Sequence, residues 1–325
     1  MTEHCDNAVA WPRIDAILPA THHVTGQDFE ALLGAPLLFA GSFRDTRATR
    51  FWTADYLRRA VGNKRVPVFV SVDGRFPGGA GPRDATRYSF VTMTVSECID
   101  RLLGAPSPPI LAPGEKCYLY QSPAELYQEV LTDVPTPIYV PRALRASLTQ
   151  QLWIGGPGNV TPVHYDMSEN ILVQVVGTKT VLLWDPAQYP LLYLSPLRTT
   201  HDRQSPIDLD SPDLARFPRF VHARALRCDL GPGDALYIPA CWMHHVRSHE
   251  FSISVNFWWE LPEILELSQL LQATEHSPLD WKDHAVTAQL RKWRPQLREL
   301  LHHLAADGSI PARYVERLRR ALAAG

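Results

Sequence analysis

The sequence has few cysteines, no marked excess of either charge and no long apolar run. Its five cysteines are widely spaced and form no CxxC pair: Cys5, Cys98, Cys117, Cys228 and Cys241. An odd, scattered set argues against a disulfide framework or a zinc knuckle and favours reduced, structural thiols. The 32 basic and 34 acidic side chains give a net charge of -2, which selects neither nucleic acid nor anionic lipid as a partner.

Segments that could enter a membrane are also missing. No run of about 18 apolar residues occurs, and the N-terminal MTEHCDNAVAWPRID has acidic residues and no apolar signal core. With 45% hydrophobic residues in 325, the chain can bury a large core. We therefore expect a globular cytoplasmic protein with no membrane partner.

The first of three predicted regions, residues 1–115, alternates short helix and strand signals. Thr94 and Glu97 form a capping box for a helix that Gly104 ends, and Thr53 and Gly62 bound a second helix. The β-branched VPVFVSV at 66–72 predicts a strand, and the glycine-rich 74–84 predicts a surface loop. We interpret this region as an α/β layer that wraps a central domain.

The second region, residues 116–260, has short strands separated by Gly, Pro and Asp clusters. Such strands without intervening helices predict a mainly β fold of the jelly-roll type. The exception is the irregular, Pro- and Asp-rich insertion at 201–220. An insertion of this kind either carries substrate contacts or is a structural excursion. The predicted strands are QLWIGG, NILVQVVG, TKTVLLWDP, RALRCDLGPGD, ALYIP, HHVRS and FSISVNFWW.

The third region, residues 261–325, returns to helical periodicity, with a break at Pro295 and with Pro311 near a helix start. Residues 282–325 contain nine Lys or Arg against four Asp or Glu. This excess indicates either solvated helix faces or a nucleic-acid patch. The apolar stripe of LRKWRPQLRELLHHL suits either a homodimer interface or an intramolecular cap.

A histidine and an aspartate stand two positions apart in NVTPVHYD, just after Pro162. On a strand, His164 and Asp166 would face the same side and could bind one metal ion. An HxD match is common by chance, and His4 with Asp6 makes a second one in a segment with no sign of a rigid site. We therefore look for a third ligand near the first pair.

That third ligand is offered by GPGDALYIPACWMHHVRS, where a turn leads into a strand with His244 and His245. Two histidines and one carboxylate form a facial triad that holds Fe(II) and leaves positions open for a cosubstrate and O2. Neighbouring strand residues face opposite sides, so only one of the two histidines can be a ligand. A zinc site with Cys241 and His244 lacks a second half.

These motifs, taken in order, resemble the JmjC, or cupin-like, family of Fe(II)- and 2-oxoglutarate-dependent oxygenases. NVTPVHYD, GTKTVLLWDP, the 201–220 insertion, GPGDALYIPACWMHHV and VNFWW are similar to the family's asparaginyl hydroxylases. WTADYL and the path from ILVQVVG to NFWWELP are also similar to its tRNA wybutosine hydroxylases. The resemblance covers at least residues 52–259 and implies a double-stranded β-helix. It implies His164 and Asp166 on the second strand and His244, as the first histidine of IPxxWxHxV, on the seventh.

The resemblance also assigns the cosubstrate residues. It implies that Lys179, one strand after the first ligands, binds the distal carboxylate of 2-oxoglutarate, with Thr161 and Tyr118 as hydrogen-bonding partners. Asn170 and Asn256 would lie beside the metal and the cosubstrate. A lone strand lysine would ordinarily point outward. A buried one needs an anion, which a dicarboxylate supplies.

The expected function is hydroxylation of a protein or peptide side chain, with release of succinate and CO2. Hydroxylation of a modified tRNA base is the alternative, and a non-catalytic cupin-like binding protein or a zinc hydrolase on the same barrel are others. Histone demethylation is not favoured, because reader modules and zinc clusters are missing. Five tryptophans are expected to pack in the barrel, with lining of the substrate groove as the alternative for any one of them: Trp153, Trp184, Trp242, Trp258 and Trp259.

Overall fold

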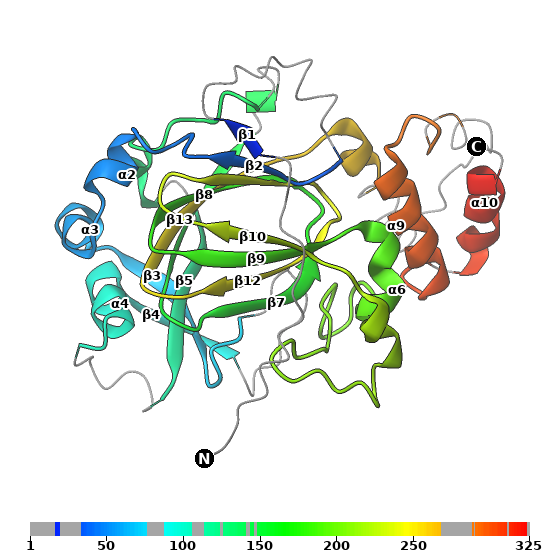
Figure 1. The fold of residues 1–325 in the computed structure, drawn as a ribbon, viewed down its shortest axis with the longest axis horizontal. Helices are drawn as coiled ribbons and strands as arrows, with labels where there is room; N and C mark the ends of the chain where they lie inside the picture. Colours follow the sequence, from blue (N-terminus) through cyan, green and yellow to red (C-terminus); the bar gives the residue numbers. More distant parts are fainter. Residues whose placement is uncertain are drawn as a thin grey trace.

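A computed structural model gives the structure of this chain. It describes residues 17–19, 34–76, 88–105, 114–123, 126–140, 144–145, 148–267, 288, 290–310 and 312–323. The pair His4 and Asp6 and most of the 74–84 loop lie outside these residues. Two sheets face one another in the centre of the molecule, and helices lie at both ends (Figure 1). Among the described residues, no helix is long and apolar enough to cross a membrane.

Eight consecutive strands form the two faces of the jelly roll, which confirms the predicted mainly β fold. Four of them pair in the order β11-β8-β13-β6 within a larger sheet, and the other four form a separate sheet in the order β10-β9-β12-β7. All these neighbours are antiparallel. The strands are β6 (Thr149–Gly155), β7 (Val160–Tyr165), β8 (Glu169–Val176), β9 (Lys179–Trp184), β10 (Leu226–Leu230), β11 (Ala235–Ile238), β12 (Met243–Ser248) and β13 (Ser252–Trp259).

N-terminal strands extend both edges of the larger sheet. Beyond β11 lie β2 (Leu37–Ala40) and β1 (Ile17–Pro19), and beyond β6 lie β5 (Lys116–Pro123), β3 (Arg65–Ser71) and β4 (Tyr88–Thr94). The helices of this region are α2 (Arg47–Phe51), α3 (Ala54–Val61), α4 (Val95–Leu102) and α5 (Gln128–Leu131). Thr53 caps α3, and Thr94 and Glu97 form the predicted capping box of α4. Each cap satisfies amide groups that the first helical turn leaves unpaired.

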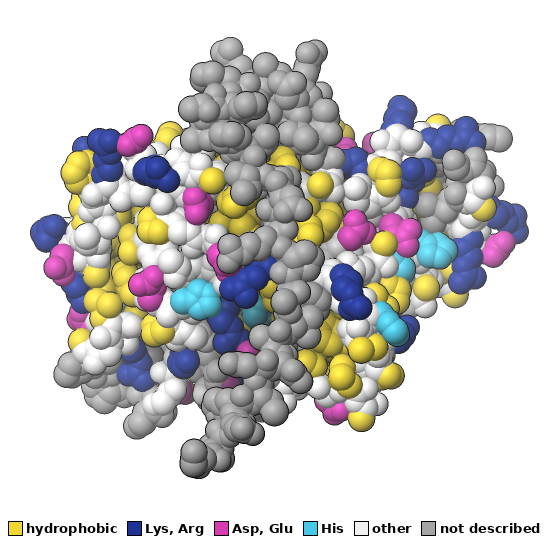
Figure 2. All heavy atoms as spheres, viewed as in Figure 1, with side chains coloured by type: hydrophobic (Ala, Val, Ile, Leu, Met, Phe, Trp, Pro, Cys, Tyr) yellow, Lys and Arg dark blue, Asp and Glu magenta, His cyan; other side chains and the backbone are white. Residues whose placement is uncertain are grey.

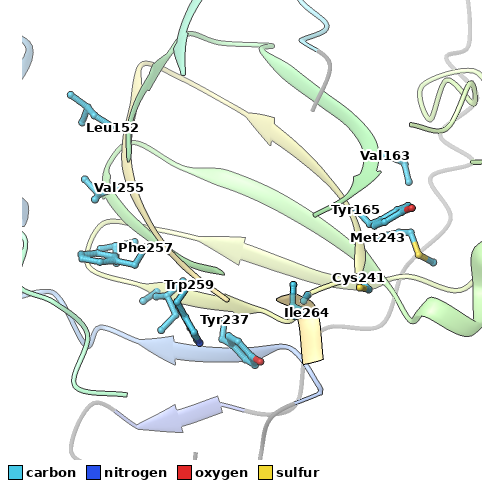
Figure 3. Packing of buried hydrophobic residues seen from close by; sticks show 14 of the residues in the cluster. Leu152, Val163, Tyr165, Tyr237, Cys241, Met243, Val255, Phe257, Trp259 and Ile264 are labelled. Carbon is cyan, nitrogen blue, oxygen red and sulfur yellow. The ribbon is translucent and has the colours of Figure 1, made fainter. Parts of the chain in front are cut away.

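Side chains inside the barrel form a small apolar cluster that is separate from the main core. This inner cluster contains Leu172, Val181, Leu183, Leu236 and Ile238. Residues on the opposite strand faces join the main core, where Tyr165 and Met243 lie side by side (Figure 3). The period of two along each strand therefore separates an interior that can hold a ligand from a packed exterior.

The insertion between β9 and β10 has no strand, as the sequence predicted. It contains η3 (Pro186–Gln188), α6 (Tyr189–Leu192) and η4 (Pro218–His222), joined by turns. A charged clasp ties it to the barrel: Arg75 contacts Asp208 and Asp210, and Arg247 of β12 contacts Asp210. The insertion is thus fastened beside β7 and β12.

The C-terminal region contains a short helix at 262–267, α9 (Pro295–Ala306) and α10 (Ala312–Ala323). Pro295 is the first residue of α9, where its missing N–H costs no helical hydrogen bond. The apolar stripe of α9, which includes Leu297, Leu300 and Leu304, is buried within this one chain. The stripe therefore favours the intramolecular cap over a dimer interface.

Candidate metal centre and cosubstrate cavity

The pairing of β7 with β12 brings the predicted metal ligands together. His164 and His244 are directly opposite each other across this antiparallel pair, with ring centroids 4.2 Å apart. Asp166 is the first residue after β7 rather than a strand residue, which corrects the prediction. Its Oδ2 lies 3.7 Å from His164 Nε2 and 3.5 Å from His244 Nε2. One ligand atom from each of the three residues lies within 4.8 Å of the others.

A bulge next to the histidines sets their direction. The register between β12 and β7 shifts between His244 and Val246, so Pro162 and Val163 of β7 share one position opposite His245. Proline has no N–H to donate to a sheet, and it is tolerated at position 162 because it lies at a bulge of β7, which is an edge strand. His244 faces the interior, whereas His245 is buried on the opposite face of β12, not at the surface.

Both inward histidines are held in the tautomer that a metal ion requires. His164 Nδ1 lies 2.8 Å from the carbonyl oxygen of Pro162, and His244 Nδ1 lies 3.0 Å from that of Trp242. A carbonyl oxygen only accepts, so each Nδ1 carries the proton and each Nε2 presents a lone pair. Burial and the neighbouring His244 lower the pKa of His164 to about 4, which keeps this ring neutral.

The triad opens into a cavity inside the barrel, and every predicted cosubstrate residue lines it. Its walls also include apolar side chains and two of the five tryptophans that we expected first of all to pack in the barrel. The lining residues are Tyr118, Trp153, Thr161, Asn170, Leu172, Lys179, Ile238, Val246, Asn256 and Trp258, in addition to the triad. Trp153 and Trp258 thus lie at the cavity wall, while Trp184, Trp242 and Trp259 are buried in the cores.

Lys179 is a buried cation at the wall of this cavity. It begins β9, two strands after β7 rather than one, and it shares the inward face with Val181 and Leu183. Its side chain is only 2% exposed, and Nζ donates a hydrogen bond to Ser254 Oγ at 2.7 Å. No carboxylate forms an ion pair with it within the described part of the chain. Burial lowers the pKa of Lys179 from 10.5 to about 7.

Two residues near the site had no assigned role in the sequence interpretation. Ser254 stands two positions before Asn256 on β13, so their shared strand face was a usable signal. Glu169 is fully buried and binds Tyr237 of β11, the 240 amide and Arg294 of the C-terminal region. No local pattern in the sequence links Glu169 to Arg294, because the two residues are far apart in the chain.

A family model for the cupin-like domain matches residues 28–263. This match covers most of the chain and all of the jelly roll. The chain belongs to the cupin-like domain family. The resemblance to JmjC and cupin-like proteins is confirmed at the level of the family and the fold.

Several curated members of the cupin-like family are about one-third identical to this chain. A tRNA wybutosine-synthesizing protein 5 from Danio rerio is 34% identical over 66% of this chain and 65% of its own length. A lysine-specific demethylase 8 from Xenopus tropicalis is 30% identical over 78% of this chain and 54% of its own length. The human bifunctional peptidase and (3S)-lysyl hydroxylase JMJD7 is 32% identical over 75% of this chain and 84% of its own length. The chain thus spans just under two thirds of the length of the first relative and little more than half of the second.

Proposed function

We propose that this protein is an Fe(II)- and 2-oxoglutarate-dependent oxygenase that hydroxylates a protein or peptide side chain. One observation carries the proposal: a His-Asp-His cluster and a buried lysine line the same cavity. Two histidines and one carboxylate suit Fe(II) with open coordination positions. The zinc hydrolase alternative accounts for the cluster but gives Lys179 no role.

The polar groups of the cavity suit a dicarboxylate cosubstrate. Lys179 provides a buried positive charge, and Thr161 and Tyr118 line the same cavity. Within the described part of the chain, the buried Trp258 Nε1 and Asn256 Oδ1 have no hydrogen-bond partner, although Asn256 Nδ2 donates to Asn170 Oδ1 at 2.9 Å. Buried polar atoms are rarely left unpaired, so a bound ligand that satisfies them is expected.

In this proposal the protein's residues hold the metal ion, orient its ligands and limit water in the cavity. When bound, Fe(II) supplies the activation of O2 that couples conversion of 2-oxoglutarate to succinate and CO2 with hydroxylation of a C–H bond. His164, Asp166 and His244 hold the ion, and the carbonyl groups behind the two rings orient them. Apolar side chains such as Leu172 and Val246 limit water in the cavity.

A protein or peptide substrate is favoured over the alternatives. Two of the relatives are named for chemistry on lysine, a demethylase and a lysyl hydroxylase. The clasped insertion beside β7 and β12 provides a rigid surface on which a peptide could lie next to the cavity. A non-catalytic role is disfavoured because a binding protein has no need of a triad, a buried lysine and unpaired polar groups in one cavity.

Hydroxylation of a tRNA base is the second candidate. A relative named for tRNA wybutosine synthesis supports it, as do the exposed Arg317, Arg319 and Arg320 of α10. Figure 2 shows Lys and Arg side chains over the end of the molecule where α9 and α10 lie. Such side chains would bind phosphate groups, with an affinity that falls as salt rises.

The test is incubation with Fe(II), 2-oxoglutarate and O2, followed by assay of succinate and mass spectrometry of candidate peptides and tRNA. A gain of one oxygen on a peptide supports the proposal, and the same gain on tRNA supports the second candidate. Anaerobic titration with Fe(II) and 2-oxoglutarate should give the weak visible charge-transfer band of the complex. No band and no succinate, even with a full range of candidate substrates, would refute the oxygenase proposal and leave the non-catalytic and zinc hydrolase alternatives.

A further inference from the structure

A buried ion pair connects the C-terminal region to the segments that carry the metal ligands. Glu169, the first residue of β8, is 0% exposed. Its Oε1 pairs with Nη2 of Arg294, the residue that immediately precedes α9. Its Oε2 accepts hydrogen bonds from the Tyr237 hydroxyl at 2.5 Å and from the Ala240 amide at 3.2 Å. The carboxylate is thus surrounded by three donors, two from the segment 237–240 and one from the C-terminal region.

Glu169 anchors the turn that delivers His244. The turn between β11 and β12 is tied back by two consecutive amides: that of Ala240 binds the Glu169 carboxylate, and that of Cys241 binds the Asp166 carbonyl at 2.7 Å. Cys241 has φ +70, a left-handed conformation that is unfavourable for a residue with a side chain. Such a conformation persists only where surrounding contacts hold it.

This geometry makes the separation of two ligands depend on Glu169. Asp166 stands three residues before it, and His244 stands three residues after the anchored turn residue Cys241. Moving the turn would move His244 Nε2 away from Asp166 Oδ2, which now lie 3.5 Å apart. Metal affinity is sensitive to such displacements because the ligands must converge on one ion.

The charge of Glu169 in turn depends on Arg294. Among the described residues, Arg294 is the one cation paired with this carboxylate, and its Nε also binds Glu263 at 3.0 Å. A buried carboxylate without its cation strongly destabilises the fold, and it tends to become hydrated or protonated. Glu169 would then no longer hold the turn in its present place.

We propose that the Arg294–Glu169 ion pair is a positioning device for the metal centre, so that the C-terminal helical region completes the site as well as covering it. This inference rests on the proposed function, since it takes the His-Asp-His cluster to be a metal site. Neither Glu169 nor Arg294 is among the residues that line the cavity. Both act through the turn at 239–242.

The test compares metal affinity with folding stability in full-length variants. Co(II) serves as the probe, because its visible absorption reports the coordination geometry without turnover. Glu169→Gln keeps the shape but removes the charge and one acceptor, and we expect it to weaken Co(II) binding about tenfold and to change the absorption band. Arg294→Lys keeps the charge but has a single nitrogen in place of the two with which Arg294 binds Glu169 and Glu263, and we expect a smaller weakening.

Asp133→Asn is the matched control. Asp133 is also a buried carboxylate with three donors, namely Arg47, Trp52 and Tyr56, but it does not line the cavity. We expect it to lower the unfolding temperature while leaving Co(II) affinity within about twofold of the wild type. Glu263→Gln removes only the second partner of Arg294 and should likewise spare the metal.

The outcomes are distinct. Selective loss of Co(II) affinity in Glu169→Gln and Arg294→Lys, at a stability that Asp133→Asn matches, supports the inference. Variants that lose stability yet bind Co(II) with the wild-type affinity and spectrum overturn it, while the proposed function stands. A wild-type protein that binds no Co(II) overturns the metal site and the inference together.

Discussion

Replacing Lys179 with methionine tests the part of the site that distinguishes an oxygenase from other metal-binding barrels. Methionine is similar in length and suits the apolar face that Lys179 shares with Val181 and Leu183. If Lys179 is the anchor of the cosubstrate, the variant should lose a buried, charge-assisted contact with a carboxylate. Such a contact contributes about 3 kcal/mol, so the Kd for 2-oxoglutarate should rise roughly a hundredfold.

The same substitution should change how stability depends on pH when no cosubstrate is present. Burial in the fold lowers the pKa of Lys179 from its ordinary value of 10.5 to about 7. The unfolded chain therefore binds more protons between these two values, and the wild type gains stability as pH rises from about 7 to 10.5. At pH 7 and below, the buried Lys179 lowers the free energy of unfolding by its full amount. This amount is up to about 5 kcal/mol, at about 1.4 kcal/mol per pKa unit.

The measurement is urea unfolding of the wild type and Lys179→Met across this pH window. We expect Lys179→Met to be the more stable protein near pH 7, with an advantage that shrinks as pH rises. Binding of 2-oxoglutarate to the wild type should also weaken above pH 7, because the free site then loses its proton. Lys64→Met is the control, since Lys64 pairs with Glu129 away from the cavity. A stability difference independent of pH, or an unchanged Kd in Lys179→Met, would refute the reasoning.

Three further predictions concern the metal, the cosubstrate and the insertion. His244→Ala should abolish the Co(II) absorption band, while His245→Ala should retain it; equal loss in both would undo the choice between these neighbours. Asn256→Leu removes a polar pair of the cavity wall and should raise the KM for 2-oxoglutarate about tenfold with little change in Co(II) affinity. Arg75→Met opens part of the clasp on Asp210 and should raise the KM for a peptide substrate several-fold while leaving that for 2-oxoglutarate unchanged, as steady-state kinetics would show.

Much of the fold follows from local patterns in the chain. The capping box at Thr94 and Glu97 and a strand over most of 66–72 are present as expected, and the predicted helical break at Pro295 is where α9 begins. These features depend on residues that are neighbours in sequence, so short-range rules suffice. Two predictions were wrong by small amounts: β7 ends before Asp166, and Lys179 lies two strands after β7 rather than one. Strand bounds depend on pairing partners, which local patterns do not specify.

The candidate site divides along the same line. The i, i+2 spacing of His164 and Asp166 and the turn before His244 are visible in the sequence, since strand periodicity alone places such side chains on one face. The sequence did not show that Trp153 and Trp258 line the cavity, because an aromatic residue in a strand packs in the core as readily as it lines a cavity.

The sequence by itself determined which residue types can bind a metal ion and an anion, and that His164, His244 and Lys179 lie in strands. The tertiary structure decided that β12 pairs with β7 in the register that sets His244 opposite His164, and that Lys179 points inward to Ser254. It also brought Arg294 to Glu169 across 125 residues. These contacts join segments far apart in the chain, and their geometry depends on how the whole core packs, which no local pattern specifies.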